Sequence, residues 1–199
     1  MNKIKKLVIG SMLLLSSFFV MSPQSEAAGN THRVQPGETY WKIANKYGMP
    51  TAYLKRANNA MTNQVFIGQN LRIPNYQVSE ADKDLIAHIV HAEAKGEPYA
   101  GKVAVATVIL NRVASPDFPD TVKSVIYQKV NGHYAFTPVQ DGSFNQEPDA
   151  ASRRAVNEAL AFRGQGNGSL FFYNPKTSVS DWIFSRQVTV TIGKHRFAK

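Results

Sequence analysis

The feature that most constrains this chain is a stretch with helical periodicity, residues 84–93, that carries one carboxyl group on its apolar side. At about 100° per residue, its larger apolar side chains share one arc of about 140°: Leu85, Ile86, Ile89 and Val90. Glu93 lies at about 80° on the same wheel, inside that arc. Loss of hydration there disfavours the charged form and raises the pKa, as a general acid near neutral pH requires. We therefore predict Glu93 as the catalytic residue.

Two other interpretations of this stretch start from its polar residues. Glu93 lies at the end of the helix, where it can reach water or pair with Arg112 as a structural ion pair. His88 and His91 project at about 300° and 240°, away from Glu93, so the three groups cannot share one ion. The chain has no cysteine and no His-Glu-x-x-His pattern. We therefore predict no metal and no cofactor.

Residues 1–27 have the pattern of a secretory signal peptide. Three lysines open the chain, an apolar run follows from Leu7 to Met21, and small residues precede a cleavage point after Ala27. The run is shorter than the ~20 apolar residues that a membrane-spanning helix needs. We expect an exported protein of a bacterial envelope, with no stable membrane insertion once the signal is removed.

The charge of the chain indicates the kind of partner it meets. The formal net charge is +9 with no cysteine among 199 residues, so stability depends on burial without disulfides. A positive excess favours contact with a polyanionic surface. No nucleic-acid-binding motif is present and export argues against nucleic acid, so anionic cell-wall polymer is the expected partner. We expect a monomer.

Residues 31–75 are predicted to form a small separate module of order β-α-α-β. Thr39 is the expected N-cap of its first helix, and Gly48 ends that helix. Thr51 is the expected cap of the second helix. Alternating apolar residues then indicate a closing strand that stops at Pro74.

This module resembles the LysM module in four segments: Val34-Gln-Pro-Gly-Glu-Thr, Trp41-Lys-Ile-Ala-x-x-Tyr-Gly, Leu54-x-x-x-Asn58 and Gly68-Gln-Asn-Leu-x-Ile-Pro. The resemblance implies binding to glycans that contain N-acetylglucosamine, through the two loops that flank the helix pair. The residues implied are Gly37, Thr39, Tyr40 and Ile67. Trp41 remains open between packing in the core and stacking on a sugar.

Residues 76–83 are predicted as a linker, and residues 84–199 as a larger α+β domain of helices with a small antiparallel sheet. Two strand-like runs, Ser169 to Tyr173 and Val188 to Phe197, supply that sheet. Residues 130–146 lack a helical or strand period and indicate a structured loop. Arg112 lies on a helix that is apolar nearly all round, so it needs a carboxylate or a carbonyl partner, in a structural role.

The larger domain resembles the SleB/CwlJ family of bacterial cell-wall hydrolases over nearly all of residues 84–197. The resemblance rests on these segments: Ala92-Glu93-Ala-x-Gly-Glu-Pro98, Val108-Ile-Leu-Asn-Arg-Val113, Ala135-Phe-Thr137, Phe172-Tyr-Asn-Pro175 and Thr191-Ile-Gly-x-His195. It implies a lysozyme-like domain that cleaves peptidoglycan as a lytic transglycosylase. The catalytic glutamate of the family falls on Glu93.

The resemblance implies cleavage between N-acetylmuramic acid and N-acetylglucosamine, with Glu93 as acid and then base. A hydrolase would instead need a second carboxylate about 5 to 9.5 Å away, and the available ones are Asp141, Glu147, Asp149 and Asp181. Aromatic faces and short polar groups suggest substrate contacts at five positions: Phe136, Thr137, Tyr173, Asn174 and Trp182. His195 is equally well interpreted as a strand residue.

These observations predict a secreted peptidoglycan lytic transglycosylase of the bacterial cell wall or spore envelope, acting in spore cortex or wall degradation. A muramidase that hydrolyses the same bond is the nearest alternative. A wall-binding or spore-layer protein with an inactive lytic fold is the alternative of another class.

Overall fold

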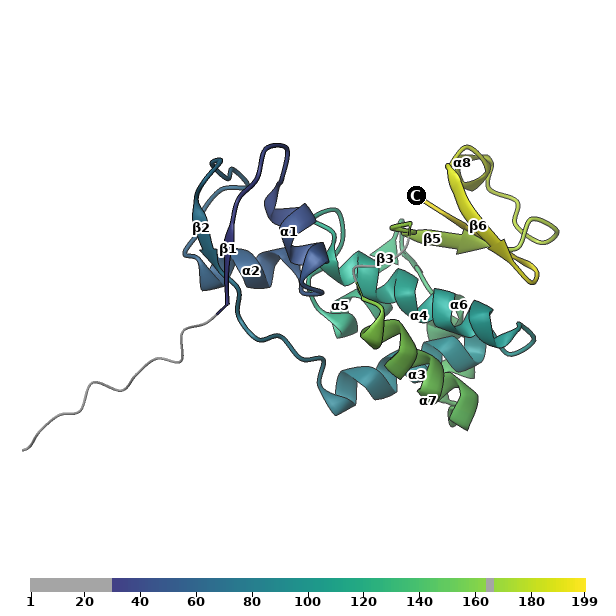
Figure 1. The fold of residues 1–199 in the computed structure, drawn as a ribbon. Helices are drawn as coiled ribbons and strands as arrows, with labels where there is room; N and C mark the ends of the chain where they lie inside the picture. The colour runs from purple at the N-terminus through teal and green to yellow at the C-terminus, as the bar shows by residue number, and fades with distance from the viewer. Residues whose placement is uncertain (1–29, 164–166) are drawn as a thin grey trace, which may run out of the picture.

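The computed structural model describes residues 30–163 and 167–199. The predicted signal peptide, residues 1–27, lies outside the described residues. Within them, no helix is both long enough and apolar enough to cross a membrane. The chain forms a small first module and a larger helical domain with a sheet at its far side (Figure 1), so the predicted α+β class is confirmed.

The first module has the predicted β-α-α-β order. Strands β1 (Thr31–Arg33) and β2 (Asn70–Arg72) pair antiparallel, with His32 opposite Leu71. Helices α1 (Tyr40–Lys46) and α2 (Thr51–Ala57) pack beside them. The core of the module is formed by side chains from α1, α2, β2 and the segments that flank the four elements: Val34, Tyr40, Ile43, Ala44, Met49, Leu54, Leu71 and Ile73.

The caps of this module agree with the sequence in two places and differ in one. The hydroxyl oxygen of Thr39 accepts from Lys42 N at 3.2 Å, as an N-cap does. Gly48 follows α1 with φ +62°, which favours glycine. Thr51 is not a cap, because Pro50 holds that position and Thr51 is already helical. Its hydroxyl donates instead to the carbonyl of Ala114 at 2.5 Å, in the second domain.

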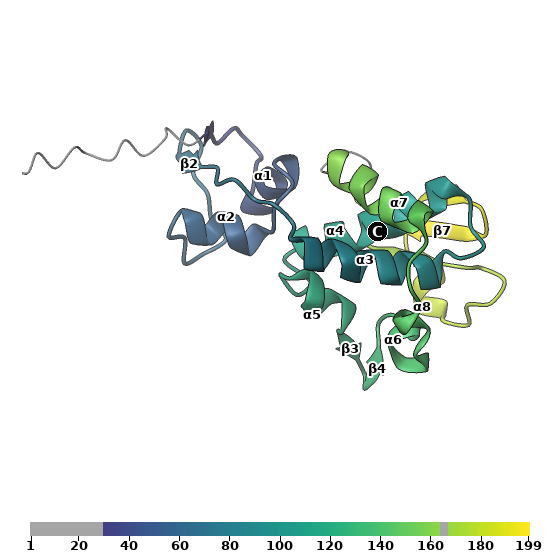
Figure 2. The ribbon, with the colours of Figure 1, turned by 90° about the horizontal axis from the view of Figure 1, so that it is seen from below.

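Three helices form the body of the second domain: α3 (Glu80–Glu93), α4 (Tyr99–Ala114) and α7 (Ala150–Ala161). They lie side by side when the molecule is seen from below (Figure 2). Ser79 caps α3 by accepting from Asp82 N at 3.1 Å. The helix therefore begins four residues before the predicted boundary at residue 84, and the second half of the predicted linker is helical.

Helix α4 is central, as its apolar composition predicts. Val105, Val108 and Ile109 are fully buried against α3 and α7. The short helix α5 (Val122–Ile126), capped by Thr121, closes the side of the core nearest the first module.

The segment predicted as a structured loop contains several short elements: β3 (Lys129–Val130), β4 (His133–Tyr134), α6 (Thr137–Asp141) and the 3-10 helix η1 (Ser143–Asn145). Each element is five residues or fewer, too short to produce a visible period. Gly142, with φ +83°, separates α6 from η1. The segment packs on α3 near its carboxyl end through α6 and η1.

The chain ends in a three-stranded antiparallel sheet of order β5-β7-β6, with β5 at Phe171–Tyr173, β6 at Val188–Ile192 and β7 at His195–Ala198. This confirms the predicted small sheet. A short helix, α8 (Asp181–Phe184), lies between β5 and β6. The backbone N–H of Lys194 donates to a Glu97 carboxylate oxygen at 2.9 Å, which attaches the β6–β7 turn to the start of α4.

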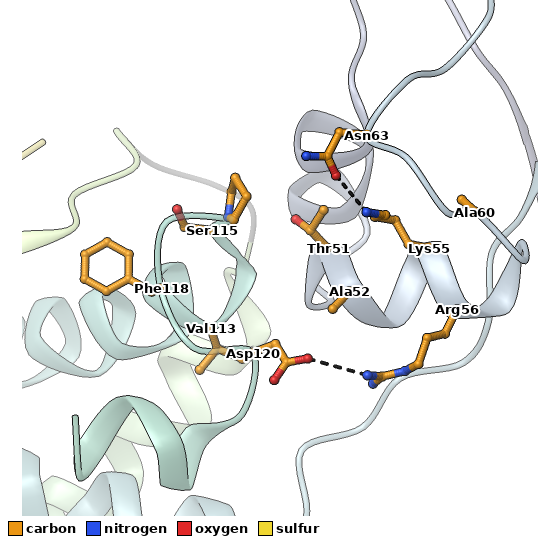
Figure 3. Close-up of a pocket in the computed structure, with 11 residues that line it drawn as sticks. Thr51, Ala52, Lys55, Arg56, Ala60, Asn63, Val113, Ser115, Phe118 and Asp120 are labelled. Carbon is orange, nitrogen blue, oxygen red and sulfur yellow. Dashed lines mark hydrogen bonds and ion pairs between the residues drawn. The ribbon is translucent and has the colours of Figure 1, made fainter. Parts of the chain in front are cut away.

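The two units touch along the carboxyl end of α4. Besides the bond from Thr51 to Ala114, the Arg163 guanidinium donates to the Gly48 carbonyl. Beside these contacts lies a pocket of about 380 Å³ between α2 and the segment that follows α4 (Figure 3). Charged groups line it from both units, and Arg56 of α2 faces Asp120 across it at 3.5 Å.

Candidate active site

Glu93 is the last residue of α3 and is half-buried. The buried apolar residues that precede it on the helix, Ile86, Ala87, Ile89 and Val90, have exposed fractions of at most 1%. Glu93 therefore lies at the edge of the core, as its place on the helical wheel predicts, and part of its surface still reaches solvent.

The pKa of Glu93 is raised to about 7. Burial is the largest cause, and the nearby Asp141 carboxylate adds to it, while Arg112 acts in the opposite direction. The last turn of a helix also carries the negative end of its dipole, which disfavours a second negative charge. Near neutral pH this carboxyl group is therefore present in both its protonated and its charged form.

Arg112 is the buried cation of the site, with an exposed fraction of 8%. Its Nε donates to the Leu170 carbonyl at 2.7 Å. Its guanidinium lies 5.1 Å from the ring centroid of Phe118, 5.1 Å from that of Phe136 and 5.6 Å from that of Phe171. Burial lowers its pKa to about 10 and Glu93 opposes that change. Among the described residues no ion pair joins it to Glu93, so its partner is a carbonyl and not the carboxylate.

The two histidines of α3 hold neighbouring segments. His88 Nδ1 donates to the Phe144 carbonyl at 2.8 Å. His91 Nδ1 accepts from the backbone N–H of Asp149 at 3.4 Å. Residues 30–163 and 167–199 contain no group of three side chains arranged to hold a metal ion. Both histidines thus position the segment that joins η1 to α7.

The four candidate second carboxylates occupy different surroundings. Asp141, at the end of α6, accepts from Ser143 N at 2.8 Å and acts electrostatically on Glu93. Glu147 pairs with Arg153, and Asp149 caps α7 by accepting from Ser152 N at 2.6 Å. Asp181 is the first residue of α8. Asp141 is thus the candidate that the electrostatics connect to Glu93.

Two of the predicted substrate contacts lie in the interior. Phe136 has an exposed fraction of 1% and packs against Phe172, and Tyr173 has one of 6% and packs beside Ile183. These rings have no free face for a sugar, which contradicts their predicted stacking role. The alternation of strand β5 and the turn before α6 place them inward.

The other three predicted contacts remain accessible. Thr137 is exposed at the start of α6, and Asn174 is half-buried, with its side-chain oxygen accepting from Lys176 N at 3.0 Å. The Trp182 side chain is 50% exposed, and Arg186 lies over its ring at 4.2 Å. Trp182 packs edge-on against Phe171, which in turn contacts Arg112. Trp182 is therefore linked to the region of Glu93 through two side chains.

The loops of the first module meet at one end of its sheet. The N–H of Gly68 donates to the Val34 carbonyl at 2.9 Å, which brings the loop after β1 beside the loop before β2. Gly37, with φ +78°, Thr39 and Ile67 are exposed there. Tyr40 is 2% exposed and belongs to the core, so its predicted glycan contact is wrong. Sequence reasoning missed Phe66, whose side chain is 63% exposed in the same loop.

Comparison with known proteins agrees with this division of the chain. Residues 96–198 match the Cell Wall Hydrolase family, and residues 32–74 match the LysM domain. The family match begins three residues after Glu93.

Similar curated proteins include the spore cortex-lytic enzyme of Halalkalibacterium halodurans, 48% identical over 60% of this chain and 35% of that protein. The spore cortex-lytic enzyme of Bacillus cereus is 38% identical over 78% of this chain and 61% of its own length. The chain thus spans between about a third and three fifths of these relatives.

A solved structure with a similar fold is the catalytic domain of the germination-specific lytic transglycosylase SleB from Bacillus anthracis. It has a TM-score of 0.56 and 42% identity, over 64% of this chain and all of that domain.

Fold and site together define a two-module protein, in which a small module precedes a helical domain with a half-buried, readily protonated carboxyl group. The chain belongs to the Cell Wall Hydrolase family, with a LysM domain at residues 32–74.

Proposed function

We propose that this protein is an exported lytic transglycosylase that cleaves the bond between N-acetylmuramic acid and N-acetylglucosamine in peptidoglycan, with Glu93 as its general acid and base. The observation that carries the proposal is the pKa of about 7 at a half-buried carboxyl group. A general acid is most effective when its pKa is close to the working pH. The names of the relatives support spore cortex or cell wall as the setting.

The proposed reaction uses a single carboxyl group in two steps. Glu93 donates its proton to the bridging oxygen, and the N-acetylglucosamine unit leaves with that oxygen as its 4-hydroxyl group. Positive charge then develops at C1 of the muramic residue. The 6-hydroxyl of the same residue attacks C1 and returns its proton to Glu93. The products are a 1,6-anhydro end and a regenerated acid, with no water consumed.

Arg112 and Asp141 shift the pKa of Glu93 in opposite directions. Without the buried guanidinium the carboxyl group would bind its proton more strongly, and without Asp141 it would bind it less strongly. Arg112 cannot take the proton itself, because its own pKa is about 10 and its Nε is engaged by Leu170. We assign it a positioning role at the site.

The test is digestion of purified peptidoglycan with the wild type and with Glu93→Gln, followed by mass spectrometry of the fragments. Anhydro-muropeptides from the wild type, and a loss of at least about a thousandfold in rate for the variant, are expected. Glu80→Gln is the matched control, because Glu80 lies at the other end of the same helix and pairs on the surface with Lys83. Absence of any cleavage by the wild type would favour the inactive wall-binding alternative.

Hydrolysis of the same bond is the second candidate, because Asp141 is the one of the four candidate carboxylates that acts electrostatically on Glu93, and a hydrolase needs a second carboxylate. A hydrolase yields reducing muramic ends in place of anhydro ends. Asp141→Asn would then abolish cleavage. In the transglycosylase mechanism the same variant keeps its product and only lowers the pKa of Glu93.

We also propose that the exposed loop residues Gly37, Thr39 and Ile67 bind N-acetylglucosamine units of the wall. Binding there would raise the concentration of glycan near the second domain, because the two units touch and are joined by a short linker.

A further inference from the structure

A second pocket lies between the two units, where α1 of the LysM domain faces α4. The pocket there has a volume of about 200 Å³ and is lined by residues of α1, of α4 and of the segment before β5: Trp41, Asn45, Asn111, Asn167, Gly168 and Leu170. We propose that Trp41, Asn45 and Asn111 form a binding subsite for one neutral N-acetylhexosamine unit of the glycan strand. The choice of ligand rests on the proposed function.

Trp41 supplies the flat apolar surface of this pocket. Its side chain is 37% exposed, while its helix neighbours Tyr40, Ile43 and Ala44 form the core of the LysM domain. The indole is therefore not needed to fill that core. A tryptophan at the edge of a pocket offers an apolar face and one N–H donor, which suits a ligand with both apolar and polar sides.

The two asparagines supply the hydrogen-bonding groups. Asn45 lies four residues after Trp41, so both side chains point from the same face of α1. Asn111 comes from α4 and is fixed, because its Nδ2 donates to the Ser169 carbonyl at 2.9 Å. That bond leaves its Oδ1 as the acceptor available to a ligand. Amide groups can pair with both the hydroxyl and the acetamido groups of an amino sugar.

The absence of charge in this pocket selects the ligand class. The six described residues that line it are uncharged, although the chain as a whole has a formal net charge of +9. The pocket on the other side of the contact differs, because Lys55, Arg56 and Asp120 line it (Figure 3). A polyanion or a peptide carboxylate would gain nothing from an uncharged pocket, whereas N-acetylglucosamine carries no charge.

The pocket is adjacent to the residues that influence the candidate acid. Asn111 precedes Arg112 on α4, and Leu170, which lines the pocket, accepts the hydrogen bond from Arg112. Arg112 in turn acts on Glu93. A sugar bound in this pocket would therefore lie beside the segment that holds Arg112, and the LysM domain would contribute to binding the glycan strand close to the second domain.

The chain has two tryptophans, Trp41 and Trp182, so a Trp182→Phe variant makes Trp41 the sole source of indole fluorescence. We would titrate this variant with N-acetylglucosamine oligomers, which lack muramic residues and are not substrates. The expected result is a saturable change in Trp41 emission that is insensitive to salt, because the ligand and pocket are uncharged. Adding Asn45→Ala should weaken binding by about tenfold, which corresponds to about 1.4 kcal/mol.

Two controls separate this subsite from other causes. Lys46→Ala changes the same helix outside the pocket and should leave the titration unchanged. Ile67→Asp should weaken the loop site and leave the Trp41 response in place. Three outcomes would overturn the proposal: no emission change, equal affinity with and without Asn45, or loss of the response in Ile67→Asp. None of these readouts requires cleavage, so they fail independently of the proposed enzymatic activity.

Discussion

Arg112 and Glu93 influence each other's ionisation although no ion pair joins them among the described residues. The Leu170 carbonyl and three aromatic rings hold the guanidinium in place instead. A direct ion pair would keep the carboxylate charged and poorly suited to donate a proton. Burial and the Asp141 carboxylate outweigh the guanidinium and leave the Glu93 pKa at about 7, where the carboxyl group can both give and take a proton.

The first prediction concerns Arg112→Met. Removing the cation removes the influence that lowers the pKa of Glu93, so that pKa should rise above about 7. If protonated Glu93 is the acid, the fall in activity at high pH should move to higher pH. Measuring the rate of peptidoglycan cleavage across pH 5 to 9 checks this. Arg112→Lys keeps a positive charge but loses the hydrogen bond to the Leu170 carbonyl. If the charge is the cause, its activity should fall at the same high pH as that of the wild type.

The second prediction is that Glu93→Gln stabilises the protein above neutral pH. Burial raises the pKa of Glu93 from 4.5 to about 7, so the folded state holds this proton more tightly than the unfolded state does. The contribution of Glu93 to stability is therefore complete below about pH 4.5 and is lost as pH rises through about 7, by up to about 3 kcal/mol. Glutamine has no charge at any of these pH values, so the variant does not lose this stability as the pH rises.

Urea unfolding of the wild type and Glu93→Gln at pH 5 and pH 8 measures this difference. From pH 5 to pH 8, the free energy of unfolding of the variant should rise relative to that of the wild type. If the difference in unfolding free energy between the two proteins is the same at both pH values, Glu93 is fully hydrated in the folded state. That result would remove the physical basis for its role as an acid.

Asp149 provides the third prediction, on acid stability. Hydrogen bonds from Ser152 hold its pKa at about 2, with Lys102 and His91 nearby. A lowered pKa stabilises the folded state above about pH 4, and that contribution is lost as pH falls through about 2. Asp149→Ala removes the cap of α7 and leaves the buried Lys102 with Ser152 alone, and should cost about 1 to 2 kcal/mol at pH 7.

Asp149→Asn is the matched variant, because an asparagine also caps helices but has no charge. At pH 7, Asp149→Asn should lower the free energy of unfolding by less than Asp149→Ala does. The loss caused by Asp149→Asn should vanish near pH 2. Chemical denaturation across this range gives both values. An equal cost for both variants at pH 7 would show that the charge, and not the cap, is the source of the stability.

Residues with strong local signals were predictable from the sequence. The helical period of residues 84–93 placed Glu93 at the edge of the core, and alternation gave the strands of the terminal sheet. Helix caps at Thr39, Ser79 and Asp149 also follow from local chemistry.

Contacts between distant segments were not predictable in this way. Thr51 has the composition of a cap, but a carbonyl 63 residues away takes its hydroxyl. Phe136, Tyr173 and Tyr40 have the aromatic faces that stack on sugars, and only the packed structure places them inside. The link from Asp141 to Glu93 likewise depends on how a segment without a period folds over α3.

The last prediction compares two glycines in the left-handed region, Gly193 and Gly132. Gly193 has φ +58°, and a Cβ there would overlap the Glu97 carboxylate and approach Pro98 Cδ to 2.7 Å. Gly132 has φ +84°, with nothing within 4 Å of its Cβ position. Gly132→Ala should therefore cost about 1 kcal/mol from backbone strain alone, whereas Gly193→Ala should cost about 2 to 4 kcal/mol because the overlap is added.

The difference between the two variants isolates that overlap, because the backbone penalty is common to both. Thermal unfolding of Gly193→Ala beside Gly132→Ala measures it. Glu97→Ala combined with Gly193→Ala removes the overlapping carboxylate, so the extra cost should fall even though the bond to Lys194 N is also lost. Equal costs for the two single variants would mean that the β6–β7 turn is not held against α4, and the sheet would then have no fixed position beside the candidate acid.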